Sequence, residues 1–305
     1  MIMRTTLLAL LAIAMLSAAC RKEDDDSGSG SEDTVPQGPM LVMKFRFDST
    51  QVRLNNLGQP AALPPGHAAQ SPRFNKMSAH YIEFAPGMLT ALGAGTVVYH
   101  APETTAGGST AIDFSQSVKA GQGGTFFSMP LAQMTPGTYE WLRVSLAYQN
   151  YDIKFRYVDA TWGTFNLWGT VASFIGYNTY IANYTVRDQS VAVNANKLQG
   201  YWGFEVINPP IATAPVTGQA PAGATTVPNP LFATSPIPAG SCVVTGQFAS
   251  PLVITGTETA NVVIEVALST NNSFEWLDNG DGIYEPAAGD AVVDMGVRGM
   301  IPSVQ

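Results

Sequence analysis

The densest group of residues that could do chemistry lies between residues 278 and 290. Two tight Asn-Gly and Asp-Gly steps are surrounded there by carboxylates and an amide. Closely spaced oxygen ligands around a sharp turn suit Ca²⁺, which takes roughly six to eight oxygens. The candidate ligands are Asp278, Asn279, Asp281, Ile283, Glu285 and Asp290. Calcium is therefore the one cofactor that the sequence suggests.

This segment resembles the calcium loops of EF-hand-like and dockerin-type repeats, in an altered register. With Asp281 and Gly282 at the fifth and sixth positions, Leu277 takes the first position, where an Asp is expected, and Ala288 takes the twelfth, where a carboxylate is expected. The alternative is a hairpin turn in which Asp and Gly occupy positive-φ positions. A bound ion would stiffen the connection into residues 292–294 rather than take part in a reaction.

Aromatic residues are dense between residues 157 and 204, where they alternate with Asn, Thr and Gly. Aromatic faces beside amides and hydroxyls suit sugar rings, which stack and form neutral hydrogen bonds. Aromatic residues also form strands and fill cores, so most of these are expected to be buried. Trp162 and Trp168, each beside a glycine, are the two expected at the surface, and Tyr177 joins them as a candidate ligand-binding residue.

Catalytic motifs are missing from the sequence. His67, His80 and His100 lack metal-ligand spacing, and no Gly-x-Ser-x-Gly elbow occurs. A glycosidase pair could come from two distant strands, but Glu83, Glu140 and Glu205 are expected to face solvent from strands. His80 is expected to be structural. We therefore predict a protein that is not an enzyme.

Alternating apolar residues predict short antiparallel strands between turns. Residues 40–48 place Met43, Phe45 and Phe47 on one face, residues 141–148 place Leu142, Val144 and Leu146 on one face, and residues 261–268 do so with Val262, Ile264, Val266 and Leu268. The only helical turn expected is at Leu131–Met134. The predicted fold class is all-β, an antiparallel β-sandwich of jelly-roll-like type.

The first 38 residues predict where the protein is located in the cell. Residues 1–19 carry Arg4, a short apolar run and small residues, as a signal peptide does, and the run is too short to span a bilayer. Leu16-Ser17-Ala18-Ala19-Cys20 resembles the lipobox of bacterial lipoproteins, with the Leu one position further from the Cys. Residues 21–26, Arg-Lys-Glu-Asp-Asp-Asp, resemble the surface-export signal of Bacteroidota lipoproteins. Cleavage after Ala19 without lipidation is the alternative.

The resemblance implies an outer-membrane protein that faces the cell exterior. Its anchor would be lipid on Cys20, and residues 20–38 would form a flexible acidic tether. In the body, residues 39–205 are expected to form a β-sandwich, residues 206–240 a Pro/Ala/Thr-rich loop or linker, and residues 241–305 strands that complete the body; two separate domains are the alternative. Cys242 is expected to be buried and inert.

Composition excludes several classes of protein. Of the 305 residues, 46% are hydrophobic and 12% are charged, which excludes general disorder. A net charge of −8 argues against a nucleic-acid partner, and two cysteines are too few for a disulfide scaffold. Since Bacteroidota surface lipoproteins commonly capture glycans, the first functional hypothesis is non-catalytic ligand binding, with a glycan as the suggested ligand. The alternatives are a structural or adhesive envelope protein that contacts protein partners, and a β-sandwich hydrolase.

Overall fold

The computed structural model describes residues 38–55, 57–209, 213–220 and 235–305. This part of the chain is almost entirely β-structure, which confirms the all-β, sandwich-like expectation. Its helical segments are the 3₁₀ turns η1 (Leu131–Gln133) and η3 (Pro286–Ala288), and η1 confirms the predicted turn. None of its helices is long and apolar enough to cross a membrane. Signal peptide, Cys20 and the tether up to residue 37 lie outside the described residues.

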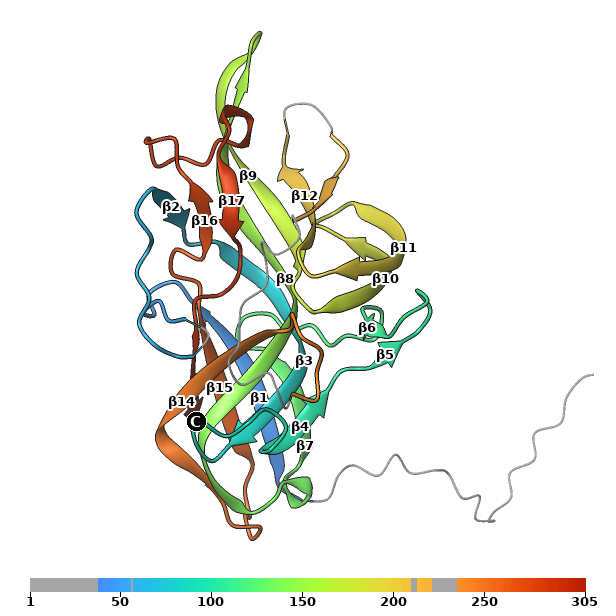
Figure 1. Cartoon of the computed structure of the whole chain (residues 1–305), viewed down its shortest axis with the longest axis vertical. Coiled ribbons are helices and arrows are strands. Elements are labelled where there is room, and N and C mark those ends of the chain that lie inside the picture. The colour runs from blue at the N-terminus through green and yellow to red at the C-terminus, as the bar shows by residue number, and fades with distance from the viewer. Residues whose placement is uncertain (1–37, 56, 210–212, 221–234) are drawn as a thin grey trace, which may run out of the picture. The chain divides into compact units, whose positions relative to one another are not determined.

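A seven-stranded sheet is built around one long strand, β8 (Gly137–Asp159). The other strands are β3 (Arg73–Ala85), β4 (Thr96–His100), β9 (Gly163–Phe174), β12 (Tyr201–Ile207), β13 (Val216–Gln219) and β14 (Cys242–Ile254). The first half of β8 pairs with β14 and the second half with β9, while β3 spans the middle. This change of partner curls the sheet into a half-barrel, which is visible along β8 in Figure 1.

Two β-bulges lie side by side where β3 pairs with β8. Ser78 pairs with Tyr148 but Ala79 pairs with Leu146, so Ala147 is an extra residue in β8. His80 is an extra residue in β3, because Tyr81 is next in register. A bulge reverses which residues of a strand face the core. Accordingly, the core-facing residues of β3 are Met77 and Ala79 before the bulge and Ile82 and Phe84 after it. In β8 they are Leu142, Val144 and Leu146 before the bulge and Tyr151 and Ile153 after it.

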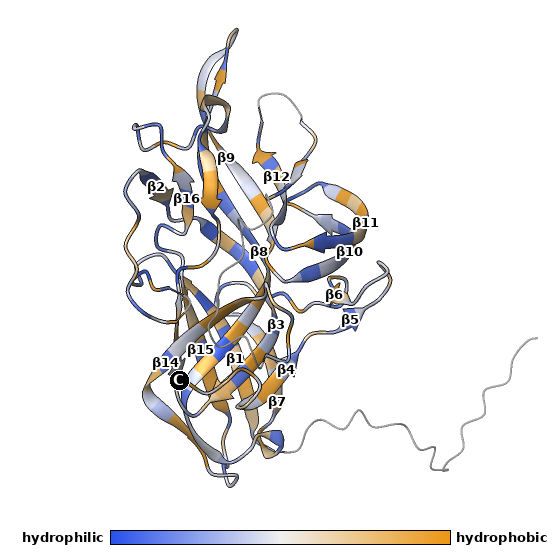
Figure 2. Cartoon of the chain, in the orientation of Figure 1, coloured by the Kyte–Doolittle hydropathy of each residue, from blue (hydrophilic) through white to orange (hydrophobic). Residues whose placement is uncertain are grey.

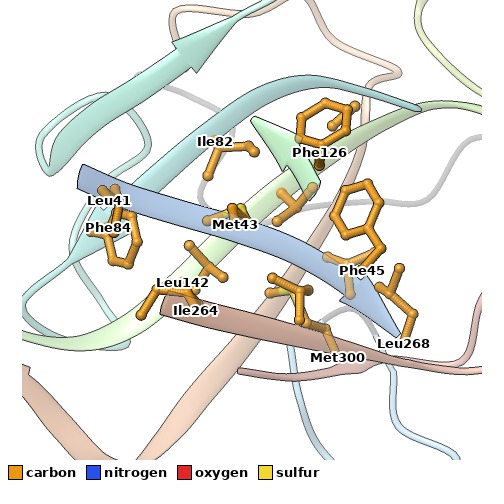
Figure 3. Packing of buried hydrophobic residues seen from close by; sticks show 14 of the residues in the cluster. Leu41, Met43, Phe45, Ile82, Phe84, Phe126, Leu142, Ile264, Leu268 and Met300 are labelled. Carbon is orange, nitrogen blue, oxygen red and sulfur yellow. The ribbon is translucent and has the colours of Figure 1, made fainter. Parts of the chain in front are cut away.

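A second sheet packs against the half of the large sheet that contains β14 and the first half of β8, the lower half in Figure 1, and the main core lies between them. The second sheet consists of β18 (Met300–Val304), β15 (Val262–Ser269), β1 (Met40–Asp48) and β7 (Thr125–Pro130). Unlike the antiparallel pairs expected, β1 and β15 run parallel. The predicted inward faces are confirmed: Met43, Phe45, Leu142, Val144, Leu146, Ile264, Val266 and Leu268 are all fully buried, and Phe47 and Val262 pack against them. Figure 3 shows this packing, and Figure 2 shows the apolar stretches on the strands that form it.

Two smaller sheets cover the upper half of the half-barrel. One consists of β11 (Ser190–Leu198), β10 (Asn178–Thr185), β6 (Ala111–Asp113) and β5 (Glu103–Thr104) and shares a core with Tyr148, Phe174 and Tyr201. The other consists of β17 (Ala291–Asp294), β16 (Phe274–Leu277) and β2 (His67–Gln70) and packs against Tyr151 and Ile153. The upper half of the large sheet is thus flanked by two separate cores.

Strands from the C-terminal part pair with strands from the N-terminal part. β14 pairs with β8, and β15 pairs with β1. Between them, within residues 206–240, β13 pairs with β12. Residues 38–305 form one compact unit.

Two carboxylates expected to face solvent are in fact buried, so that prediction was wrong for Glu83 and Glu205. Glu205 accepts hydrogen bonds from the backbone N–H groups of residues 187–189, which form the turn between β10 and β11. Glu83 accepts the N–H of Gly95 at 2.6 Å and of Gly93 at 3.1 Å. Each carboxylate is buried because it satisfies loop backbone donors that are distant in sequence. Glu140 is exposed, as predicted.

Candidate functional site

One candidate ligand site is an apolar cavity of about 750 Å³ on the half of the large sheet that contains β9, β12 and β13. Its walls come from β8, β9, β12 and β13, and from the segment that includes β17. The apolar side chains that line it include Ile153, Val171, Ile175, Trp202, Phe204, Phe274, Tyr284, Val292 and Met295. This volume lies within the range of roughly 300–1,000 Å³ that is typical of small-molecule sites.

Alternation along β12 places the aromatic wall of the cavity. Trp202 and Phe204 line the cavity, whereas Tyr201 and Glu205 lie on the opposite, buried side of the strand. Successive residues of a strand point to opposite faces, so one strand serves both the cavity and the neighbouring core.

Two glycines make room for these aromatic rings. A Cβ atom on Gly218 would lie 2.4 Å from the Trp202 ring, and one on Gly169 would lie 2.2 Å from the Phe204 ring. Neither distance is sterically tolerable, so both rings lie directly over glycine backbone on the adjacent strands. The glycines near Trp202 and Phe204 thus fix the aromatic wall of the cavity rather than form turns.

Polar groups in the cavity are few and mostly engaged. The side-chain amide of Gln199 donates to the Ile175 carbonyl at 2.9 Å, and that of Gln219 donates to the Gln199 carbonyl at 2.8 Å. Asp294 is paired with Arg298 at 2.6 Å. The Ser173 hydroxyl is buried and has no hydrogen-bond partner among the described residues. The cavity therefore offers a bound molecule few free polar groups.

The Asp-rich segment 278–290 holds one wall of this cavity. Arg156 of β8 donates to Asp281 and Glu285, each at 3.0 Å, and its backbone N–H donates to the Tyr284 carbonyl at 2.8 Å. Asp290 accepts the N–H of Glu285 at 2.7 Å. These contacts fix Tyr284 against the cavity.

The six predicted calcium ligands lie on this one segment, and the carboxylates of four of them already accept hydrogen bonds or pair with Arg156. Asp278 accepts the N–H groups of Gly280 and Gly282, as in an ordinary Asp-Gly turn, and Asn279 donates to Glu285 at 3.4 Å. Ile283 donates its N–H to Asp281. Arg156 supplies positive charge between Asp281 and Glu285, at the place where a cation would bind. Calcium binding here stays a prediction.

The three predicted ligand-binding aromatics lie apart from the cavity lining. Trp162 is 70% exposed in the turn between β8 and β9, a hairpin that projects beyond its neighbours in Figure 1. Trp168 is half-buried, with the Arg73 guanidinium 4.1 Å from its ring centroid. Tyr177 is half-buried and donates to Glu103 at 2.9 Å. The structure does not bring these three residues into one site.

Cys242 lines the cavity from the start of β14. Burial raises the pKa of its thiol to about 12. Since only the thiolate reacts, alkylation by iodoacetamide at pH 8 is expected to be on the order of a thousandfold slower in the folded protein than in urea. Mass spectrometry of residues around Cys242 over time measures both rates. Equal rates in the two states would contradict the inert role predicted for this cysteine.

The structure brings together two histidines that the sequence separates by 20 positions. The ring centroids of His80 and His100 are 4.6 Å apart, and His80 Nε2 lies 3.0 Å from Glu103 Oε1. Burial, together with the nearby His100, lowers the pKa of His80 to about 4. Reasoning from sequential spacing alone missed this cluster, because β-strand pairing rather than a motif creates it. His67 lies elsewhere, bonded to Glu275.

No protein family matches this chain, no curated protein matches it, and no solved structure matches it.

Proposed function

We propose that this protein is a non-catalytic binding protein whose apolar cavity holds an apolar or amphipathic small molecule. The observation that carries the proposal is the cavity itself, about 750 Å³ in volume and lined by Trp202, Phe204, Tyr284 and aliphatic side chains. Sites of this size and lining bury most of a ligand's surface and orient it through a few polar groups.

The few free polar groups favour an apolar ligand over a sugar. A buried glycan brings many hydroxyls, and each would lose water without gaining a partner unless the wall supplied one. The amide donors of Gln199 and Gln219 are already bonded to backbone carbonyls, and Asp294 is paired with Arg298. Burial of apolar surface contributes roughly 25 cal/mol per Å² to binding, and the apolar wall of this cavity can bury the apolar surface of a ligand.

We further propose the localisation that the N-terminal residues predict, a lipid-anchored protein of the outer membrane. Cys20 would carry lipid in the outer membrane, and residues 20–38 would be a tether that holds the body off the membrane, on the exterior side of the cell. An apolar molecule captured in the cavity would then be retained at the cell surface. Metabolic labelling of Cys20 with a fatty-acid analogue tests the anchor. An unlabelled Cys20 would reject the lipid anchor and favour secretion without lipidation.

The cavity is tested by titration with N-phenyl-1-naphthylamine, whose fluorescence rises in an apolar environment. Saturable binding at one site is expected, and Gly296→Phe is expected to weaken it about tenfold or more, equivalent to about 1.4 kcal/mol. Gly296 lines the cavity, and a Cβ there would meet only the Asp294 carboxylate, at 3.5 Å. A side chain can therefore be added at this position without a clash between its Cβ and the backbone.

Gly87→Phe is the matched control, because a Cβ on Gly87 meets only the Thr90 hydroxyl, at 3.8 Å, and Gly87 does not line the cavity. It should bind the probe as the wild type does. Equal affinity in Gly296→Phe and the wild type would place the probe outside the cavity and reject the proposal.

Glycan capture is the second candidate function, and the exposure of Trp162 favours it. A ring that is 70% exposed in a projecting turn offers a free face for stacking on a sugar, with Tyr157 also exposed nearby in β8. Glycan-array binding that disappears in Trp162→Ala would support this function. Binding that survives in this variant would reject the role of Trp162.

A further inference from the structure

The cluster of His80, His100 and Glu103 is distinct from the proposed ligand cavity. Potential ligand atoms of the three side chains all lie within 4.8 Å of one another, the only such group of three His, Cys, Asp or Glu residues in the described part of the chain. None of the three lines the cavity. His80 is fully buried, whereas His100 and Glu103 are exposed, so the cluster opens to solvent on one side.

The β-bulge in β3 positions the buried member of the cluster. His80 is the extra residue there, and its carbonyl accepts the N–H of Ala101 at 2.7 Å. This bond holds the end of β4 beside the bulge. Bulges redirect a side chain out of the regular alternation, and they are over-represented next to functional sites. The bulge thus places His80 beside His100, at the end of β4, and Glu103, at the start of β5.

Hydrogen bonds to neighbouring groups orient the other two side chains. His100 Nδ1 lies 3.0 Å from the Ala101 carbonyl, which can only accept, so Nδ1 carries the proton and Nε2 keeps its lone pair. The Tyr177 hydroxyl donates to Glu103 Oε1 at 2.9 Å. Metal-binding histidines and carboxylates are typically held by partners of this kind.

One nitrogen of the buried His80 ring has no partner in the part of the chain that the structure describes. His80 Nδ1 lacks a hydrogen-bond partner among the described residues, although the ring is fully buried. A buried polar atom without a partner costs free energy, so such atoms are rare in folded proteins unless an ion or water meets them. The protein's own hydrogen bonds therefore leave His80 Nδ1 unsatisfied, as they leave several other buried polar atoms of the described chain.

We propose that His80, His100 and Glu103 bind a divalent transition-metal ion of the Zn²⁺ class. Two imidazoles and one carboxylate are a ligand set for Zn²⁺, with a fourth position left for water, and the exposed side of the cluster supplies that position. Imidazole nitrogens favour Zn²⁺ and its neighbours over Ca²⁺ and Mg²⁺, which prefer oxygen. Tyr177 acts as a positioning residue through Glu103.

Titration calorimetry with Zn²⁺ on the purified protein, with the visible absorption of bound Co²⁺ as a second readout, tests this site. One ion per chain is expected, with ligand-field bands that Zn²⁺ displaces. His100→Ala and Glu103→Gln, both at exposed positions, should each weaken binding about tenfold or more, and Tyr177→Phe should weaken it by up to about tenfold.

His67→Ala is the matched control, since His67 is the one histidine of the chain that lies outside the cluster. Binding should be unchanged in this variant. No Zn²⁺ heat in the wild type, unchanged affinity in His100→Ala, or an equal loss in His67→Ala would overturn the proposal. Circular dichroism of each variant separates loss of the site from loss of the fold.

Discussion

Replacement of Glu83 by alanine is expected to lower the free energy of unfolding by about 3–5 kcal/mol, the cost of breaking a buried ion pair from one side. Glu83 and Arg143 are both fully buried, and Arg143 Nη1 lies 3.8 Å from the carboxylate. Without Glu83, the guanidinium stays buried with backbone carbonyls, such as that of Met88 at 3.2 Å, as its partners.

The same carboxylate holds the loop between β3 and β4. Its loss would leave the N–H groups of Gly93 and Gly95 without their acceptor. Such a loss is large against a typical total stability of about 5–15 kcal/mol. Urea unfolding followed by circular dichroism measures it.

Glu140→Ala is the matched control for Glu83→Ala, because Glu140 is an exposed glutamate in a strand of the same sheet. Its effect should stay within about 0.5 kcal/mol. Similar effects of the two substitutions would show that Glu83 is not a structural anchor.

The second large effect is expected for Trp276→Ala, which should cost about 3–5 kcal/mol. Trp276 is 1% exposed and packs against Phe274 and Tyr284, with ring centroids 6.1 Å and 5.5 Å away. Its removal would leave a void beneath the segment that holds Tyr284 on the cavity wall. Probe binding should therefore weaken together with stability.

Trp162→Ala gives the comparison at the other extreme of burial. This residue is 70% exposed, so its truncation should change stability by less than about 0.5 kcal/mol and leave the cavity probe bound. Thermal unfolding of both variants, measured in parallel, checks the pair. Equal destabilisation by the two substitutions would contradict the burial of Trp276 and the exposure of Trp162.

Period-2 alternation was sufficient to predict the main core. The inward faces of β1, β8 and β15 follow directly from alternating apolar residues, because one face of each strand packs against a single core. The same rule could not predict the change of face at His80 and Ala147, since a bulge depends on how β3 and β8 pair.

Contacts between residues distant in sequence also explain why the sequence predictions failed for Glu83 and for the histidine cluster. Glu83 occupies an alternating position of β3 that looks solvent-facing, but the loop after β3 covers it. His80 and His100 meet through the pairing of β3 with β4. The aromatic stretch 157–204 contains Trp202 and Phe204 of the cavity wall, but alternation alone does not tell Trp202, on that wall, from Tyr201, in the core.

The most direct test of ligand binding in the cavity is quenching of Trp202 fluorescence by dibrominated stearic acid, because bromine quenches an indole only at close contact. We predict saturable quenching in the wild type, markedly shallower quenching in Trp202→Phe, and undiminished quenching of the cavity tryptophan in Trp162→Phe. Quenching of the same depth in Trp202→Phe as in the wild type would contradict the proposal that the cavity is the binding site.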